Sequence, residues 1–255
     1  MKKLYTIKKL NSYYGKKIIL KNISLEIPSG LVCLIGPNGS GKTTLLRVLA
    51  GLNEYSGNVL LNGAEVKNFS RKKIARVLSF VMSDKKFKPS YSFTAREIIS
   101  MGRLPFTGMF GRMTKHDFEL TEQAAELLKI SHLLNRDIMT LSDGERQLIF
   151  IASAIAQDTE IILLDEPTAS LDPDKAVMIF SLLKKLSQNG KSIIAAVHDI
   201  NIASAYSDFY MAIKNGELIF NSKELNQKNL SDLYGADFIS YKNNERNDVM
   251  WRVIS

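Results

Sequence analysis

The chain has 255 residues, of which 45% are apolar and 24% charged, the balance of an ordinary globular protein. This length suits one large domain, or one domain with an inserted subdomain, and the composition excludes a disordered, collagen-like or disulfide-stapled chain. The net charge of +8 comes from basic residues scattered in ones, twos and threes, without the block or zinc-finger pattern typical of nucleic-acid binding. We therefore expect no nucleic-acid partner and only a mild bias towards membrane surfaces.

The sequence contains no segment that predicts a membrane anchor. No stretch approaches the roughly 18 apolar residues of a membrane span, and no signal-peptide core follows the N-terminal lysines. If the protein acts at a membrane, another chain must supply the spans. The single cysteine, Cys33, lies in an apolar run, which favours a buried strand thiol in a reducing compartment over a reactive one.

The first third of the chain predicts mainly strands. Alternating apolar and polar residues indicate antiparallel strands, and apolar runs without alternation indicate buried ones. A helix between them should end at Gly51, and Asn62-Gly63 is typical of a tight hairpin turn. The predicted elements are antiparallel strands within 1–27 around a turn at 14–17, a strand at 31–35, a helix at 43–51, a hairpin over 57–68 and a strand at 77–82.

Helical periodicity follows, and then strands and helices alternate. The predicted elements are helices at 94–101, 115–128 and 144–156, strands at 161–164 and 192–197, helices at 173–186 and from residue 200, strands at 210–213 and 218–220 around Asn215-Gly216, and a final hairpin from residue 238. This alternation predicts an α/β fold with a parallel sheet. We expect one domain over 1–255, in which 1–87 and 158–255 form the core and 88–157 an inserted helical subdomain.

A phosphate-binding loop is the most specific local signal. Residues 36–43 fit the pattern G-x-x-x-x-G-K-[ST] and lie between a predicted buried strand and a helix, as the mechanism requires. Glycines let successive N–H groups converge on phosphate oxygens, Lys42 would bridge the β- and γ-phosphates of ATP, and Thr43 would ligate Mg²⁺. The expected ATP-binding residues are Gly36, Pro37, Asn38, Gly39, Ser40, Gly41, Lys42, Thr43 and Thr44. Such a loop alone would serve a kinase, a GTPase, a helicase or a transporter.

Two later strands end in polar residues that should meet at the ligand-binding edge of a parallel sheet. Asp165 and Glu166 follow the strand at 161–164, where Asp165 suits contact with Mg²⁺ and Glu166 suits polarisation of an attacking water. His198 follows the strand at 192–197. Alone it would be read as a structural residue, but beside the other motifs it is expected to contact the γ-phosphate and to hold the water and Glu166.

Residues 141–147 open a helix without a phosphate loop. Ser142 and Glu145 form an S-x-x-E capping box, which is sufficient to explain them. The same helix start is also a potential second anion-binding site. The segment resembles the signature motif of ABC ATPases, usually written LSGGQ, with Asp143 replacing one glycine and Glu145 the glutamine.

The order of motifs matches the ABC family across nearly the whole chain. The resemblance implies a phosphate-loop core with an N-terminal antiparallel β-subdomain and an inserted helical subdomain. It makes Tyr14 the aromatic residue that stacks on adenine and Asp172 the D-loop residue at a dimer interface. It also implies two subunits, expected to be identical, that sandwich two ATP molecules. The signature residues that would reach the partner's ATP are Ser142, Asp143, Gly144 and Glu145.

One position departs from the family pattern. A glutamine usually follows the strand after the hairpin, where it contacts Mg²⁺, and alignment places Ser83 there. A serine hydroxyl is shorter but could still hold a metal-bound water, so Ser83 is kept as a candidate metal contact. We therefore expect slower hydrolysis than in a relative that carries the glutamine.

Residues 101–105 and the Glu145-Arg146-Gln147 form of the signature resemble importers of iron–siderophores, haem and vitamin B12, although Gly102 and Pro105 could equally be an ordinary helix stop. The resemblance implies an ATPase at the cytoplasmic side of the inner membrane, with transmembrane permease subunits and, through them, a substrate-binding protein. Two alternatives remain open. One is a soluble ABC-type ATPase that acts on chromosomes, DNA repair or ribosomes, and the other is a weakly hydrolysing nucleotide-dependent clamp.

Overall fold

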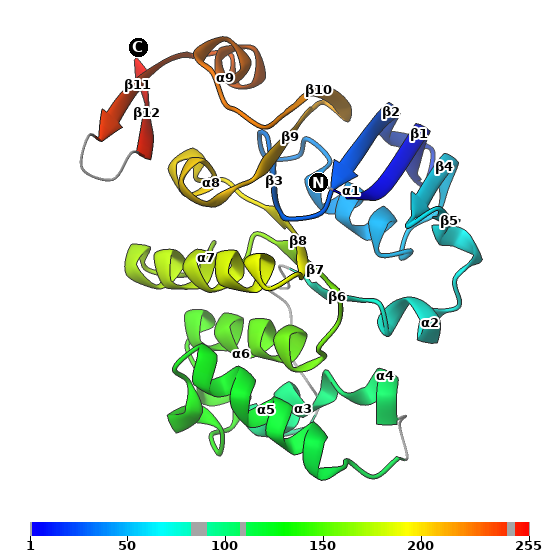
Figure 1. Cartoon of the computed structure of the whole chain (residues 1–255), viewed down its shortest axis with the longest axis vertical. Helices are drawn as coiled ribbons and strands as arrows, with labels where there is room; N and C mark the ends of the chain where they lie inside the picture. Colours follow the sequence, from blue (N-terminus) through cyan, green and yellow to red (C-terminus); the bar gives the residue numbers. More distant parts are fainter. Residues whose placement is uncertain (1, 83–90, 108–110, 244–247, 255) are drawn as a thin grey trace.

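The structure is a computed structural model that describes residues 2–82, 91–107, 111–243 and 248–254. A six-stranded sheet in the order β10-β9-β3-β8-β7-β6 runs through its middle (Figure 1). Five strands of this sheet are parallel, and β10 pairs antiparallel with β9. The strands are β3 (Leu31–Ile35), β6 (Leu78–Val81), β7 (Ile161–Asp165), β8 (Ser192–Ala196), β9 (Phe209–Lys214) and β10 (Glu217–Ser222).

Every residue of β3, β7 and β8 is buried, which explains why their sequences are apolar without alternation. Neighbouring residues face opposite sides of the sheet: Cys33 packs into one hydrophobic core and Leu34 into the other. The predicted parallel α/β core is therefore confirmed, and so is the burial of Cys33, which raises the pKa of its thiol to about 12.

A second, antiparallel sheet has the order β2-β1-β4-β5 and covers one face of α1 (Lys42–Leu49). Its strands are β1 (Lys3–Tyr14), β2 (Lys17–Pro28), β4 (Tyr55–Leu61) and β5 (Ala64–Glu65). The predicted turn at Asn62-Gly63 is present, with φ of 47° and 84°. The hairpin is shorter than expected because the Glu65 carboxylate accepts the Val59 N–H at 3.1 Å, after which the chain turns into a 3-10 helix (Val66–Asn68).

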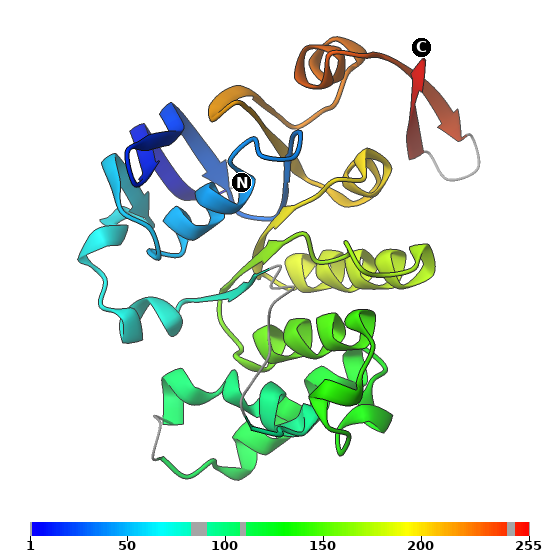
Figure 2. The ribbon, with the colours of Figure 1, turned by 180° about the vertical axis from the view of Figure 1, so that it is seen from behind.

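The opposite face of the central sheet is covered by helices, with the inserted helices stacked beyond it in a further layer (Figures 1 and 2). The predicted helices are present within a residue or two of their expected ends, whereas α2, α4 and α9 were not predicted. The helices are α2 (Arg71–Ala75), α3 (Ala95–Met101), α4 (Leu104–Thr107), α5 (Lys115–Leu127), α6 (Asp143–Ala156), α7 (Pro173–Gln188), α8 (Ile200–Tyr206) and α9 (Gln227–Tyr234).

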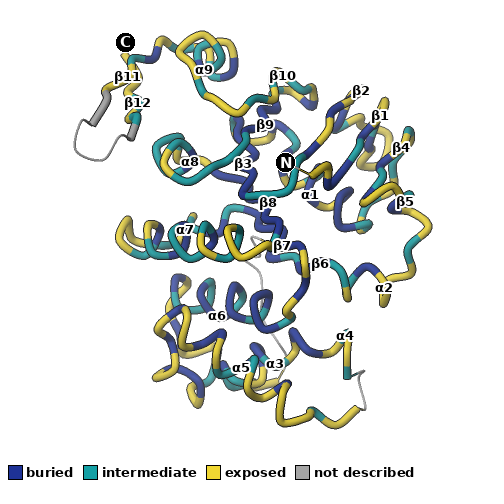
Figure 3. The backbone as a smooth tube through the Cα atoms, in the orientation of Figure 1, coloured by how far each residue is buried: buried dark blue, intermediate teal, exposed yellow. Residues whose placement is uncertain are grey.

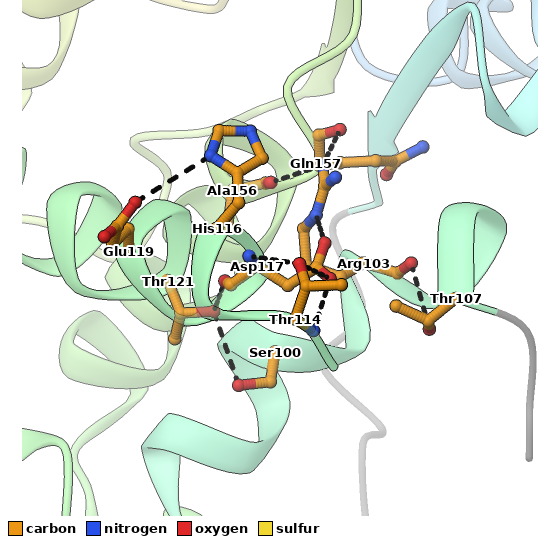
Figure 4. Close-up of polar contacts among 10 residues, drawn as sticks. All are labelled: Ser100, Arg103, Thr107, Thr114, His116, Asp117, Glu119, Thr121, Ala156 and Gln157. Carbon is orange, nitrogen blue, oxygen red and sulfur yellow. Dashed lines mark hydrogen bonds and ion pairs between the residues drawn. The ribbon is translucent and has the colours of Figure 1, made fainter. Parts of the chain in front are cut away.

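A buried ion pair holds the inserted helices together (Figure 4). Arg103 Nε donates to Asp117 Oδ1 at 2.8 Å, and both side chains are almost completely buried. Arg103 Nη1 also donates to the carbonyl oxygens of Ala156 and Gln157, at 3.1 and 2.8 Å, which satisfies the C-terminal end of α6. Hydrogen bonds from the Thr114 hydroxyl and the Arg103 guanidinium lower the pKa of Asp117 to about 2, so the pair is charged at neutral pH.

The chain ends in the predicted hairpin, formed by β11 (Asp237–Asn243) and β12 (Asp248–Ile254). The hairpin packs on α8, where the Asn201 side chain makes two hydrogen bonds to the backbone of Trp251. Asn201 Oδ1 accepts the Trp251 N–H at 2.7 Å, and Asn201 Nδ2 donates to the Trp251 carbonyl oxygen at 3.3 Å. Figure 3 shows that burial is concentrated in the central sheet and in the helix faces that contact it.

Candidate nucleotide-binding site

The loop between β3 and α1 takes a path that only glycine allows at several points. Gly36, Gly39 and Gly41 have φ of 150°, 74° and 111°. A Cβ on Gly36 would lie 2.1 Å from the carbonyl oxygen of Ile213 on β9, so the loop begins directly against the neighbouring strand. The glycine spacing of the motif thus corresponds to backbone geometry and close packing in the folded chain.

Several polar groups of the loop are suited to an anion. The N-cap of α1 is Gly41, so no side chain caps the first N–H groups of this helix within the described residues, and its first turn carries no acidic residue. The buried Ser40 Oγ has no hydrogen-bond partner among the residues described. Lys42 Nζ donates to the carbonyl oxygens of Gly36 and Pro37, at 2.7 and 3.1 Å. Burial lowers the pKa of Lys42, while the carboxylates of Glu166 and Asp165 act in the opposite direction.

A pocket of about 240 Å³ lies over the loop. Ile19, on β2 of the antiparallel sheet, forms one wall, and Glu166, which follows β7, also lines the pocket. Ile19 was not predicted as a site residue, because one apolar residue in an alternating strand carries no signal. The residues that line the pocket are Ile19, Gly39, Ser40, Gly41, Lys42, Thr43, Thr44 and Glu166.

The acidic strand end lies next to the loop. Thr43 Oγ1 donates to Asp165 Oδ2 at 2.8 Å, so two predicted metal ligands are in direct contact. Thr43 and Asp165 are oxygen donors of the kind that Mg²⁺ binds alongside substrate phosphates. Their position over the loop fits a Mg²⁺–nucleotide complex, whereas the described residues contain no group of three or more His, Cys, Asp and Glu that could hold a metal by itself.

The chain leaves β7 sharply at Glu166, whose φ of 50° is uncommon for a residue with a side chain. Backbone strain of about 1–3 kcal/mol is typical of such positions and is concentrated at functional sites. His198, which follows β8, places its Nε2 2.5 Å from Glu166 Oε1. The two side chains predicted from separate strand ends therefore meet at the edge of the sheet.

The segment that resembles the signature motif forms the start of α6. Both arms of the capping box are present: Ser142 Oγ accepts the Glu145 N–H at 3.2 Å, and Glu145 Oε2 accepts the Ser142 N–H at 2.8 Å. A Cβ on Gly144 would lie 3.0 Å from the carbonyl oxygen of Ser170, so this helix start packs closely against the segment that leads to Asp172.

Some predicted residues do not line the pocket over the loop. Tyr14 lies at the β1–β2 turn with 82% of its surface exposed, and Asp172 is the N-cap of α7. Ser142 and Asp143 lie with Gly144 and Glu145 at the start of α6, outside the pocket lining. Asn38 is exposed at the tip of the loop, and Ser83 falls outside the described residues.

A phosphate loop after a buried strand, with an acidic strand end beside it, defines the class of phosphate-loop ATPases. The profile described as ABC transporter matches residues 20–169, and the chain therefore belongs to the ABC transporter family. Members of this family that serve as ATP-binding subunits are ATPases, and so is this chain.

Known proteins similar to the chain agree with this assignment. The petrobactin import ATP-binding protein YclP of Bacillus subtilis (strain 168) is 36% identical over 216 residues, which cover 84% of each chain. A structure described as the inward-facing conformation of a metal-chelate type ABC transporter is 26% identical, with a TM-score of 0.84 over 100% of this chain and 98% of that one. The cassette MJ0796, in a dimeric post-hydrolysis state bound to ADP and Pi, is 27% identical, with a TM-score of 0.76 over 88% and 100% of the two chains.

These similarities confirm the predicted fold and the binding of nucleotide. Among the described residues, no helix is both long enough and apolar enough to cross a bilayer.

Proposed function

We propose that the chain is the ATP-hydrolysing subunit of a membrane importer, and that two copies bind ATP between them. The observation that carries this proposal is the meeting of three separate sequence motifs at one sheet edge. Lys42, Thr43 and Glu166 line the pocket over the loop, and Asp165 and His198 contact Thr43 and Glu166 respectively.

In this proposal the loop binds the phosphates of ATP. Among the described residues, no side chain caps the N–H groups at the start of α1 and the Ser40 hydroxyl has no partner, so these groups would donate to phosphate oxygens. Lys42 would exchange its bonds with loop carbonyls for bonds to phosphate. Thr43 and Asp165 would hold Mg²⁺, with Ser83 as a further candidate contact. When bound, the cation would neutralise negative charge on the phosphates. Tyr14 would stack on the adenine ring.

Hydrolysis would use the pair formed by Glu166 and His198. The Glu166 carboxylate accepts a proton from water as the water oxygen attacks the γ-phosphorus atom, and the bond from that phosphorus to the bridging oxygen breaks. His198 holds Glu166 through the 2.5 Å contact and would reach the γ-phosphate from the same edge. Glu166 is therefore assigned as the general base and His198 as the residue that positions the base.

The partner copy would complete the site. Ser142, Asp143, Gly144 and Glu145 would approach the ATP held by the other subunit, and Asp172 would cross the interface. The dimeric state of MJ0796 and the close packing of Gly144 against Ser170 support this arrangement, since the signature helix and the D-loop then move as one surface. In this proposal ATP closes the pair, and its hydrolysis reopens it.

The transmembrane permease would dock where β6 meets α6. A pocket of about 210 Å³ lies there, lined by Phe80, Val81, Met82, Phe150, Ser153, Ala154 and Gln157. Such a partner would keep the chain at the cytoplasmic side of the inner membrane. The petrobactin importer and the metal-chelate type transporter support iron–siderophore, haem or vitamin B12-type cargo, delivered to the permease by a substrate-binding protein.

The test is the Glu166→Gln variant. It should bind ATP like the parent but hydrolyse at least about a hundredfold more slowly, since a positioned general base contributes about 10²–10⁴ in rate. Size-exclusion chromatography should then show an ATP-loaded dimer that ADP does not support. Hydrolysis at the parental rate would contradict the assignment of Glu166. Copurification with ribosomes or nucleic acid, and with no multi-span protein, would favour the soluble ATPase instead.

A further inference from the structure

The turn between β9 and β10, at Asn215-Gly216, is hydrogen-bonded to the phosphate loop and to β2, both of which contribute residues to the lining of the nucleotide pocket. We propose that Gly216 is a positioning residue, which sets the distance between the phosphate loop and the Ile19 wall of the pocket and thereby the affinity for ATP. This inference rests on the proposed nucleotide site. It adds a residue about 170 positions beyond the loop in sequence that no motif of that site includes.

Gly216 joins two walls of the pocket through its own backbone. Its N–H donates to the carbonyl oxygen of Ser40 in the phosphate loop at 2.9 Å, and its carbonyl oxygen accepts the N–H of Lys21 on β2 at 2.8 Å. Ser40 and Ile19, two residues before Lys21, both line the pocket. One residue therefore connects the loop of the parallel core to the strand of the antiparallel sheet, and Figure 1 shows β10 extending towards β2.

The junction has no space for a side chain. A Cβ on Gly216 would lie 2.1 Å from the backbone carbonyl oxygen of Ile19, a distance that real Cβ atoms essentially never show. On the loop side the contact is looser: a Cβ on Gly41 would lie 2.8 Å from Leu20 Cδ2 and 3.8 Å, an ordinary van der Waals distance, from the Gly216 Cα. An added methyl group at Gly216 must therefore move the strand, the turn or the loop.

The same hairpin supports the other end of the loop. The carbonyl oxygen of Ile213 on β9 lies where a Cβ of Gly36 would be, at 2.1 Å. The hairpin thus contacts the first glycine of the loop through Ile213, and the residue before Gly41 through Gly216. Because both ends of the loop rest on this hairpin, a displaced turn would displace the N–H groups that face the phosphates.

The chain contains a matched control for this turn. Asn62-Gly63 forms the turn between β4 and β5 with φ of 47° and 84°, against 52° and 81° at Asn215-Gly216. A Cβ on Gly63 would meet nothing within 4 Å. Gly63→Ala and Gly216→Ala therefore carry nearly the same backbone strain, and they differ only in what the new methyl group meets.

The experiment compares ATP affinity in the two variants of the full chain by calorimetry, with thermal unfolding as the check on folding. Gly216→Ala should weaken ATP binding at least about tenfold, since displacement of a positioning group by about 1 Å has effects of that size or more. Gly63→Ala should bind within about twofold of the parent, and its Tm should fall less than that of Gly216→Ala, because its methyl group adds backbone strain but meets no neighbouring atom. Parental affinity in a folded Gly216→Ala variant would overturn the inference and leave the proposed function intact, whereas a parent that binds no ATP would contradict the proposed function itself.

A second measurement needs no substitution, and it decides the matter if Gly216→Ala does not fold. Backbone hydrogen exchange of the parent is followed with and without Mg²⁺–ADP, which should occupy the loop without closing a dimer. Exchange should slow at the Lys21 and Gly216 amides and stay unchanged in the Asn62-Gly63 turn. Protection of the loop amides without any change at Lys21 and Gly216 would overturn the inference.

Discussion

The N-termini of α1 and α6, the two helix starts that would face ATP, differ in how their first backbone N–H groups are satisfied. The first N–H groups of α1 follow Gly41, which offers no side chain to cap them. Those of α6 are capped by the chain itself, through the reciprocal bonds of Ser142 and Glu145. Both helices point a positive N-terminal dipole outwards, but only α1 leaves its donors available for a ligand.

The charged residues at the two helix starts also differ: they are basic at α1 and acidic at α6. Lys42 stands at the start of α1, whereas Asp143 and Glu145 stand in the first turn of α6. Hydrogen bonds from the Ser142 backbone and hydroxyl lower the pKa of Glu145, so this carboxylate is ionised at neutral pH. The acidic residues are partly balanced, since Arg146 pairs with Asp143 and Arg136 lies 3.8 Å from Glu145.

These differences indicate that the two helix starts bind ATP at different stages. The α1 end depends on phosphate to complete its hydrogen bonds and should bind nucleotide without a partner. The α6 end is complete in the isolated subunit, so it can act as a preformed surface that meets ATP only when two copies close. Substitutions at four positions can break or sharpen this contrast.

The largest effect is expected at α1. Lys42→Ala should weaken ATP binding by about a hundredfold or more, because charge-assisted hydrogen bonds contribute about 1.5–3 kcal/mol each and Lys42 would make one to the β-phosphate and one to the γ-phosphate. Calorimetry with ATP measures this loss. Arg47→Ala, an exposed basic residue in the last turn of the same helix, is the control and should bind as the parent does. Equal losses of ATP affinity in both variants would indicate that the affinity depends on the overall positive charge and not on a specific contact of Lys42 with phosphate.

The next largest effect, on the free energy of unfolding, is expected at the C-terminal end of α6, where Arg103 donates to the last carbonyl oxygens. Arg103→Leu should lower the free energy of unfolding by about 3–5 kcal/mol, because Asp117 is left charged and buried. Arg96→Leu removes an exposed ion pair between Arg96 on α3 and Glu122 on α5, and it should lower the free energy of unfolding by less than about 1 kcal/mol. Urea unfolding measures both, and similar losses would contradict the importance of burial at Arg103.

A smaller change separates the two roles of Ser142. Ser142→Ala should lower the free energy of unfolding by about 1 kcal/mol through loss of the cap, whereas Ser142→Asp retains a capping oxygen and should stay within about 0.5 kcal/mol of the parent. Both should leave the affinity of the isolated subunit for ATP unchanged. Only Ser142→Asp puts a negative charge towards the partner's γ-phosphate, so it should abolish the ATP-driven dimer. A dimer as tight as the parental one would contradict the proposed interface.

The smallest effect is expected for Glu145→Gln. Glutamine also completes a capping box, so the free energy of unfolding should change by less than about 0.5 kcal/mol. Removal of the negative charge should tighten the ATP-driven dimer about two- to threefold, and the gain should shrink at high salt. Sedimentation in the Glu166→Gln background at two ionic strengths measures this effect. A weaker dimer would indicate that the carboxylate helps to hold the partner.

Sequence reasoning predicted the elements that local patterns dictate. The strand at 31–35, the loop that follows and the capping box at Ser142 each carry their own chemistry in adjacent residues, and the structure has all three. The helices α2 and α4 were missed because they have only five and four residues, too few for a clear period. The helix α9 is as long as α1 but buries only two residues, Leu230 and Leu233, which is too weak an apolar pattern.

The contacts between distant segments could not be predicted. Ile19 in the pocket, Gly216 against Ser40, and Arg103 on the last carbonyls of α6 each join parts of the chain far apart in sequence. Patterns indicate which face of a strand or helix is buried, but not which neighbour lies against it. The strand order β10-β9-β3-β8-β7-β6 was not predicted for the same reason.

The central claim is that each ATP lies between α1 of one copy and α6 of the other, and a mixture of two defective variants tests it directly. In the Glu166→Gln background, Lys42→Ala and Ser142→Asp are each expected to form no ATP-loaded dimer. A mixed pair in a head-to-tail sandwich has one doubly defective site and one intact site, because the intact loop and the intact helix start come from different copies. The mixture should therefore contain dimers that retain ATP, and its failure to form them, with both variants folded, would contradict the claim.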